Sequence, residues 1–89
     1  MNPRVVAVSR LPDEYALSVA FDNGEQRRLD LRPLLAYPVF ERLRDTAFFA
    51  LARADHGTVA WPGGIDLDPD MVYLDSVATR QAAAADAQP

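Results

Sequence analysis

The chain has 89 residues, with 13 acidic and nine basic side chains, a formal net charge of -4 and a pI near 4.7. This length fits one small domain, and the acidic balance argues against broad binding to nucleic-acid phosphates. Cysteine is absent, which excludes disulfides, zinc-thiolate sites and thiol nucleophiles. No apolar run approaches the roughly 20 residues that cross a bilayer, and no signal peptide is visible, so we expect a cytoplasmic protein.

Three stretches in the first third of the chain have the composition of strands. The stretch at about 4–10 is β-branched and apolar, and the stretch at about 14–21 alternates large apolar side chains with small ones. A turn containing proline and aspartate, at 11–14, separates them. An Asn-Gly pair then predicts a hairpin turn into a third strand at about 25–31.

The hairpin loop can have two or three residues, and the two forms place different side chains on the apolar face. A two-residue loop would continue that face with Gln26 and Arg28. A three-residue loop with a glycine bulge, at 22–24, pairs Leu17 with Leu29 and keeps one face apolar. We therefore expect the three-residue loop.

Helical signals follow in the middle of the chain. Prolines suit the first turns of two short helices, at about 33–36 and 38–44. The proline at the start of the second segment also ends the first. Asp45 is placed to cap a further turn that carries Phe48 and Phe49.

The last third of the chain predicts a small hairpin at about 51–61 and a C-terminal helix from 69. Together with the N-terminal strands, these elements predict an α+β fold built on a three-stranded antiparallel sheet. We expect residues 1–78 to form a single compact domain. The alanine-rich tail at 79–89 lacks an apolar stripe and is expected to be frayed or disordered.

Three aspartates alternate in the stretch W-P-G-G-I-D-L-D-P-D-M-V-Y, which raises the question of a calcium loop. An EF-hand loop begun at Asp66 needs glycine at its sixth position and glutamate at its twelfth, but Met71 and Val77 stand there. A structural interpretation fits better. Asp68 caps the last helix, Pro69 takes its first position and Asp70 faces its positive end.

The rest of the same stretch has two interpretations. Trp61 with Pro62 is typical of a partner-binding surface, but a lone tryptophan in so small a domain more often anchors the core. Gly63 and Gly64 then supply the bend after it. Asp66 is not needed for the cap, and we expect it to bond a turn amide or an arginine. The candidate interaction or structural residues are therefore Trp61, Pro62, Gly64, Asp66, Asp68, Pro69, Asp70 and Tyr73.

No catalytic constellation emerges from the remaining polar residues. His56 is the sole histidine and precedes glycine in an expected turn, where an exposed side chain is typical. Glu41, Asp45 and Asp55 offer carboxylates, but their spacing selects no acid–base pair. We expect no catalytic residue, no cofactor and no metal.

Arginine supplies every basic side chain. The arginines of the middle region could form a local basic patch, but interspersed carboxylates favour a solvated surface instead. These residues are Arg27, Arg28, Arg32, Arg42, Arg44 and Arg53.

The string G-T-V-A-W-P-G-G-I-D-L-D-P-D-M-V-Y, at 57–73, closely resembles the C-terminal signature of a small bacterial family called domain of unknown function 2442 (DUF2442). The strings F-D-N-G-E at 21–25 and D-L-R-P-L-L at 30–35 fit the same family, and the resemblance covers 2–75. It implies a compact α+β fold. Some members carry an additional helix-turn-helix domain, and others are encoded beside a second small protein in a toxin–antitoxin-like arrangement. The chain differs from other members at Gln26, where they have an apolar residue, and likewise at Arg28.

These observations together predict a small non-catalytic cytoplasmic protein-interaction module, such as the antitoxin-like member of a two-gene unit. The alternative is a transcription-associated regulator that contacts DNA, alone or with a partner. An enzyme is the least favoured class. We expect another small protein as the partner and no membrane contact. Self-pairing of the edge strand at 4–10 would also allow a homodimer.

Overall fold

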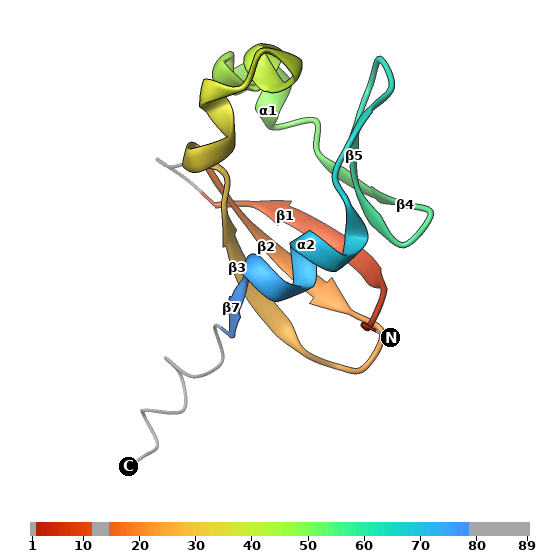
Figure 1. Cartoon of the computed structure of the whole chain (residues 1–89). Coiled ribbons are helices and arrows are strands. Elements are labelled where there is room, and N and C mark those ends of the chain that lie inside the picture. Colours follow the sequence, from red (N-terminus) through yellow and green to blue (C-terminus); the bar gives the residue numbers. More distant parts are fainter. Residues whose placement is uncertain (1, 12–14, 79–89) are drawn as a thin grey trace.

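The computed structural model describes residues 2–11 and 15–78, which form the α+β fold that the sequence predicts (Figure 1). Two antiparallel sheets, a helical layer and a C-terminal helix make up this fold. Most of the expected turn at 11–14 and the whole expected tail at 79–89 lie outside the described residues. No described helix is long and apolar enough to cross a membrane.

The main sheet has four strands in the order β1-β2-β3-β7, and each neighbouring pair is antiparallel. The strands are β1 (Val5–Arg10), β2 (Ala16–Phe21), β3 (Gln26–Asp30) and β7 (Val77–Ala78). The predicted three-stranded sheet is therefore one strand short. The missed strand, β7, has only two residues, which is too few to produce a periodic pattern in the sequence.

The hairpin between β2 and β3 has the three-residue loop that the sequence predicts. Leu17 pairs with Leu29. The Phe21 N–H donates to the Glu25 carbonyl at 2.9 Å, and Gly24 between them has a φ of +90°, which glycine adopts without strain. This register gathers large apolar side chains of both strands on one buried face, namely Leu17, Val19, Phe21 and Leu29.

A backbone contact at the start of β1 joins the main sheet to the second sheet. The Val5 N–H donates to the Gly57 carbonyl at 3.0 Å. The guanidinium of Arg4 lies against Gly57, at 2.7 Å from where a Cβ atom would stand. One residue further on, a β-bulge between Val5 and Ala7 turns Val6 outward.

The second sheet has three strands in the order β4-β5-β6. They are β4 (Arg53–Asp55), β5 (Thr58–Trp61) and β6 (Ile65–Asp66). The predicted hairpin at 51–61 is confirmed by β4 and β5, whereas the two-residue strand β6 was not predicted. All four residues of β5 are buried, because this central strand is covered on both of its faces.

The helical layer consists of η1 (Arg32–Ala36), η2 (Pro38–Arg44) and α1 (Thr46–Phe49). The first two elements occupy the predicted positions but are 3₁₀-helices, in which the Leu34 N–H donates to Leu31 three residues earlier. Prolines near both starts leave segments too short for a sustained α-helical ladder. Asp45 caps α1 as predicted, accepting from the Ala47 N–H at 3.0 Å.

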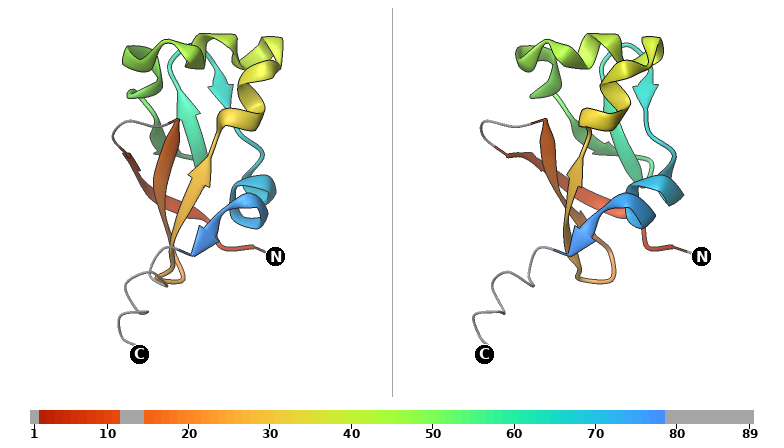
Figure 2. Two further views of the ribbon diagram at one scale, coloured as in Figure 1. Left: turned by 90° about the vertical axis from the view of Figure 1, so that its left-hand side faces the viewer. Right: turned by 60° about the vertical axis from the view of Figure 1, so that its left-hand side comes forward.

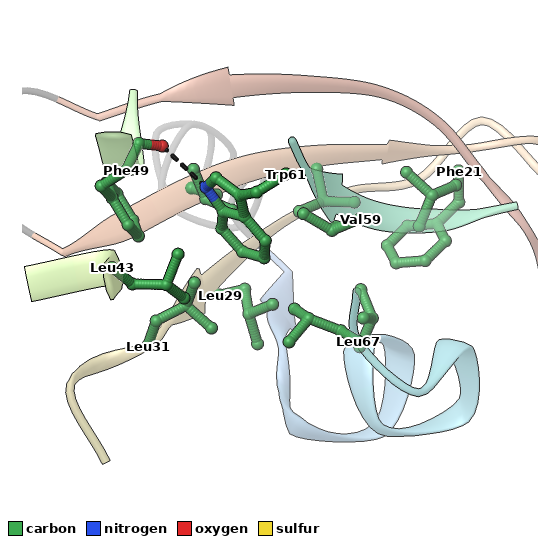
Figure 3. Packing of buried hydrophobic residues seen from close by; sticks show 12 residues of the cluster. Phe21, Leu29, Leu31, Leu43, Phe49, Val59, Trp61 and Leu67 are labelled. Carbon is green, nitrogen blue, oxygen red and sulfur yellow. Dashed lines mark hydrogen bonds between the residues drawn. The ribbon is translucent and has the colours of Figure 1, made fainter. Parts of the chain in front are cut away.

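The core lies where the two sheets, the helical layer and α2 (Pro69–Asp75) meet. Figure 2 shows the helical layer across one end of the molecule and α2 beside β3 and β7. In Figure 3, Val59 and Trp61 of β5 face Leu29 of β3 across this core. The buried cluster comprises Val5, Leu17, Val19, Phe21, Leu29, Leu31, Leu43, Phe49, Val59, Trp61, Leu67 and Val72.

Leu17→Ala is expected to lower the free energy of unfolding by about 2–5 kcal/mol, because it leaves a cavity at a fully buried position. Urea denaturation of the full chain measures this change. Leu51→Ala is the matched control, since Leu51 is 51% exposed, and its effect should stay within about 0.5 kcal/mol. Equal losses in the two variants would contradict this assignment of the core.

Candidate functional site

Trp61 anchors the core, as the sequence predicts. Its indole is 1% exposed, and its Nε1–H donates to the Phe49 carbonyl at 3.0 Å (Figure 3). The rings of Trp61 and Phe49 also pack together, with 6.1 Å between their centroids. The partner of this hydrogen bond lies at the end of α1, so the indole ties the second sheet to the helical layer.

The turn after Trp61 is the bend that the sequence predicts. Gly63 and Gly64 have φ values of +90° and +82°, a conformation that side chains with a Cβ rarely adopt. The Arg42 guanidinium lies 2.8 Å from where a Cβ of Gly63 would stand, and it also covers the Phe48 ring at 4.2 Å. Pro62 is exposed at the edge of this turn.

Asp68 and Pro69 begin α2 in the predicted way. The Asp68 carboxylate accepts from the Asp70 N–H at 2.9 Å, and Pro69 occupies the first helical turn. The Asp70 carboxylate accepts from the Asn2 amide at 3.1 Å, which connects the helix start to the N-terminal segment. Leu67 before the cap and Val72 after it are both buried in the core cluster, as in a hydrophobic staple.

Asp66 differs from its neighbours. Its carboxylate is exposed, and it has no hydrogen bond or ion pair to any other described residue. The expected bond to a turn amide or an arginine is thus not found in the described part of the chain. In that same part, no three side chains of the histidine, cysteine, aspartate or glutamate types gather closely enough to hold a metal ion.

Tyr73 belongs to a cluster that sequence reasoning missed. Its ring packs edge-on against Phe21 at 5.1 Å and lies under the Arg27 guanidinium at 4.4 Å. Arg27 donates to the Ser76 hydroxyl at 2.8 Å and to the Ser76 carbonyl at 2.6 Å. The sequence pattern alone predicts that Arg27 is one of several surface arginines. It misses the contact because Ser76 lies 49 positions away along the chain.

The Glu25 carboxylate adds a negative charge to this cluster and interacts with the Tyr73 phenol. A hydrogen bond from Asn23 lowers the pKa of Glu25, with smaller contributions from Tyr73 and Arg27. The same carboxylate, by accepting a hydrogen bond from the phenol, raises the pKa of Tyr73 above its ordinary value. The cluster therefore holds a carboxylate and a neutral phenol side by side at neutral pH.

His56 and the candidate carboxylates have separate local roles. The His56 side chain is 90% exposed at the tip of the β4–β5 hairpin, 3.0 Å from the Asp55 carboxylate. Asp45 is occupied as the cap of α1. Glu41 lies exposed on η2. Of these three carboxylates, only that of Asp55 lies beside His56. The structure does not bring His56, Glu41 and Asp45 together into one acid–base group.

Many of the arginines make contacts inside the molecule. Arg44 donates twice to the Leu35 carbonyl, at 2.9 and 3.0 Å, and Arg32 pairs with Asp30 at 2.8 Å. Arg53 lies 3.9 Å from the Asp55 carboxylate. Together with Arg27 and Arg42, these side chains contact carbonyls, carboxylates and rings of this chain, so their guanidinium groups already have partners within the molecule.

Acidic charge is concentrated in the C-terminal part of the described chain. Residues 54–78 contain five aspartates and no lysine or arginine, whereas residues 26–53 contain six arginines and three acidic residues. Two of these aspartates, Asp66 and Asp75, are exposed, and their carboxylates make no hydrogen bond or ion pair with another described residue. The exposed carboxylates of β6 and α2, here called the acidic surface, are therefore a candidate for contact with a partner.

Asp68→Ala is expected to lower the free energy of unfolding by about 1 kcal/mol, because it removes the cap of α2. Asp66→Ala removes the same charge two residues earlier without removing a bond, so its effect should stay within about 0.5 kcal/mol. Thermal and urea denaturation of both variants provide the comparison. A larger loss in the Asp66 variant would contradict the assignment of Asp68 as the cap and of Asp66 as an unbonded surface charge.

Tyr73 is expected to ionise at a higher pH than a free tyrosine, and Glu25→Gln should bring its pKa back down. Because the folded-state pKa is raised, the associated stability is present below about pH 10 and is lost as the pH rises through the folded-state value. NMR titration of ring-labelled tyrosine, with Tyr73→Phe to assign the signal, measures this. If Tyr73 ionises at the same pH in the unaltered chain and in the Glu25→Gln variant, the contact between Glu25 and Tyr73 is contradicted.

One known protein family matches nearly all of the described chain. A family model described as "Protein of unknown function (DUF2442)" matches residues 5–77. This confirms the resemblance carried by the stretch at 57–73. No curated protein and no solved structure shows a significant match.

Proposed function

The chain belongs to the DUF2442 family, and we propose that it is a small non-catalytic module that binds a basic protein partner through its acidic surface. Its partner is a second small protein encoded beside it, and the chain is the antitoxin-like member of that two-gene unit. The observation that carries the proposal is the set of five aspartates without a basic residue in residues 54–78.

The positions of the charged groups support a protein partner more than a nucleic acid. Asp66 and Asp75 present exposed carboxylates, whereas Arg27 and Arg44 use their guanidinium groups on carbonyls of the chain itself. A surface whose unengaged charge is negative attracts a basic protein and repels phosphates.

The surroundings of three ionisable groups support a non-catalytic role. The pKa shifts of Glu25, Asp30 and Tyr73 all move these groups further from neutral pH. A general acid or base works best with a pKa near the operating pH, so these three groups are poorly suited to the task. The His56 side chain is 90% exposed at a hairpin tip, a position that offers little surface to orient a substrate.

The direct experiment expresses the chain with the small protein encoded by the adjacent gene and measures their binding by calorimetry at low and high salt. We expect binding that weakens with salt, since exposed charges separated by more than about 10 Å are largely screened at 0.1 M ionic strength. The chain should also relieve any growth arrest that the neighbouring protein causes.

Charge reversal provides the matched test of the surface. Asp66→Lys should weaken partner binding by about tenfold, because it places a positive charge opposite the positive charges of the basic partner. Glu41→Lys makes the same change of charge on η2 and should have a smaller effect. Binding that is insensitive to salt and to Asp66→Lys, or a salt-sensitive shift of DNA instead, would contradict the proposal.

A further inference from the structure

A cleft lies between β3, η1 and α2. Figure 2 shows α2 passing beside β3. Its volume is about 270 Å³, and its lining residues are Leu29, Asp30, Pro33, Leu34, Met71 and Asp75. This volume is below the roughly 300 Å³ at which pockets for drug-sized ligands begin. The cleft has room for one long side chain rather than for a cofactor.

Four of the six residues that line the cleft are apolar. Leu29 is fully buried at its floor, and Leu34 and Met71 are half-buried and pack against the core cluster. The strand β7 pairs only with Arg27 and Arg28 of β3, so no described strand covers the edge of β3 at Asp30. An apolar stem could therefore enter beside β3 and cover side chains that are now half-exposed.

The charge at the mouth of the cleft is negative. Asp75 lies one helical turn after Met71, on the same face of α2. Its carboxylate is exposed and makes no hydrogen bond or ion pair with another described residue. Asp30, the other carboxylate, already accepts from the Arg32 backbone N–H and guanidinium, at 2.8 to 3.2 Å. The charge of Arg28 also acts on Asp30 and helps to lower the pKa of that carboxyl. Asp75 is therefore the carboxylate lining the cleft that has no bond to another described residue.

We propose that this cleft receives one arginine side chain of the basic protein partner. The aliphatic stem lies between Leu34 and Met71, and the guanidinium meets the Asp75 carboxylate. Long basic side chains bury their stems on apolar surface while their charged heads stay near water. A planar guanidinium can also donate two hydrogen bonds to one carboxylate, which an ammonium cannot match. This assignment rests on the proposed function, because the partner must be basic.

A short peptide tests the cleft without the partner. The ¹⁵N-labelled full chain is titrated with acetyl-Gly-Arg-Gly-amide and followed by NMR. We expect saturable shifts in the signals of Leu34, Met71 and Asp75. The same peptide with neutral citrulline in place of arginine should bind about two- to fivefold more weakly, as the loss of one partly exposed ion pair implies. Equal binding of the two peptides, or shifts only elsewhere, would overturn the proposal.

Variants then identify the groups involved. Asp75→Asn should weaken binding of the arginine peptide by about two- to fivefold, whereas Glu41→Gln, which removes one exposed charge from η2, should not change it. Met71→Arg should abolish peptide binding by filling the cleft with a guanidinium of the chain itself. If Met71→Arg fails to fold, the exposed Asp75 position still decides the question, and unchanged binding in Asp75→Asn would overturn the proposal.

The outcomes separate this inference from the proposed function. If the basic neighbour binds while the arginine peptide does not, the cleft assignment is wrong and the proposed function stands. If the peptide binds in the cleft but the neighbour does not bind the chain, the proposed function is wrong, and with it the assignment of the cleft to that partner. Dimerisation that Met71→Arg abolishes would assign the cleft to a second copy and would also overturn the inference.

Discussion

The guanidinium of Arg27 holds the segment around Ser76, just after α2, against the main sheet. Arg27 pairs with Val19 and so points to the apolar face of the sheet, where its side chain is only 16% exposed. A charge in such a place is costly unless it is bonded. Ser76 supplies a carbonyl and a hydroxyl, Glu25 supplies a carboxylate at 3.4 Å, and Tyr73 supplies a ring face.

These contacts fix where α2 ends and where β7 begins. The Ser76 carbonyl, which follows the last turn of α2, is satisfied by Arg27, and the next two residues pair with β3. Without this bonded charge, the end of α2 would lose its polar contacts to the sheet, close to the wall of the cleft that carries Met71 and Asp75. The buried charge of Arg27 thus helps to position the acidic surface on α2.

The parts of the fold that the sequence predicts are those with local physical causes. Alternation of apolar side chains specifies β2, the turn at Gly24 sets the register of its hairpin, and Asp68 with Pro69 starts α2. The parts that it misses depend on partners distant in sequence. β6 and β7 have two residues each and exist only because a neighbouring strand pairs with them. The role of Arg27 and the cleft could not be predicted for the same reason, since each is assembled from elements far apart in the chain.

The backbone hydrogen bond between Val5 and Gly57, which joins the two sheets, affects the order in which the chain folds. The β2–β3 hairpin closes a loop of three residues, whereas this joint connects positions more than fifty residues apart. Closing a long loop costs entropy before its contacts return any stability, and chains with many such contacts fold slowly. The hairpin is therefore expected to form early. The second sheet packs against β1, and α2 packs against β5 and β3. Both are therefore expected to dock after the hairpin has formed, so the acidic surface that they carry is expected to take shape late.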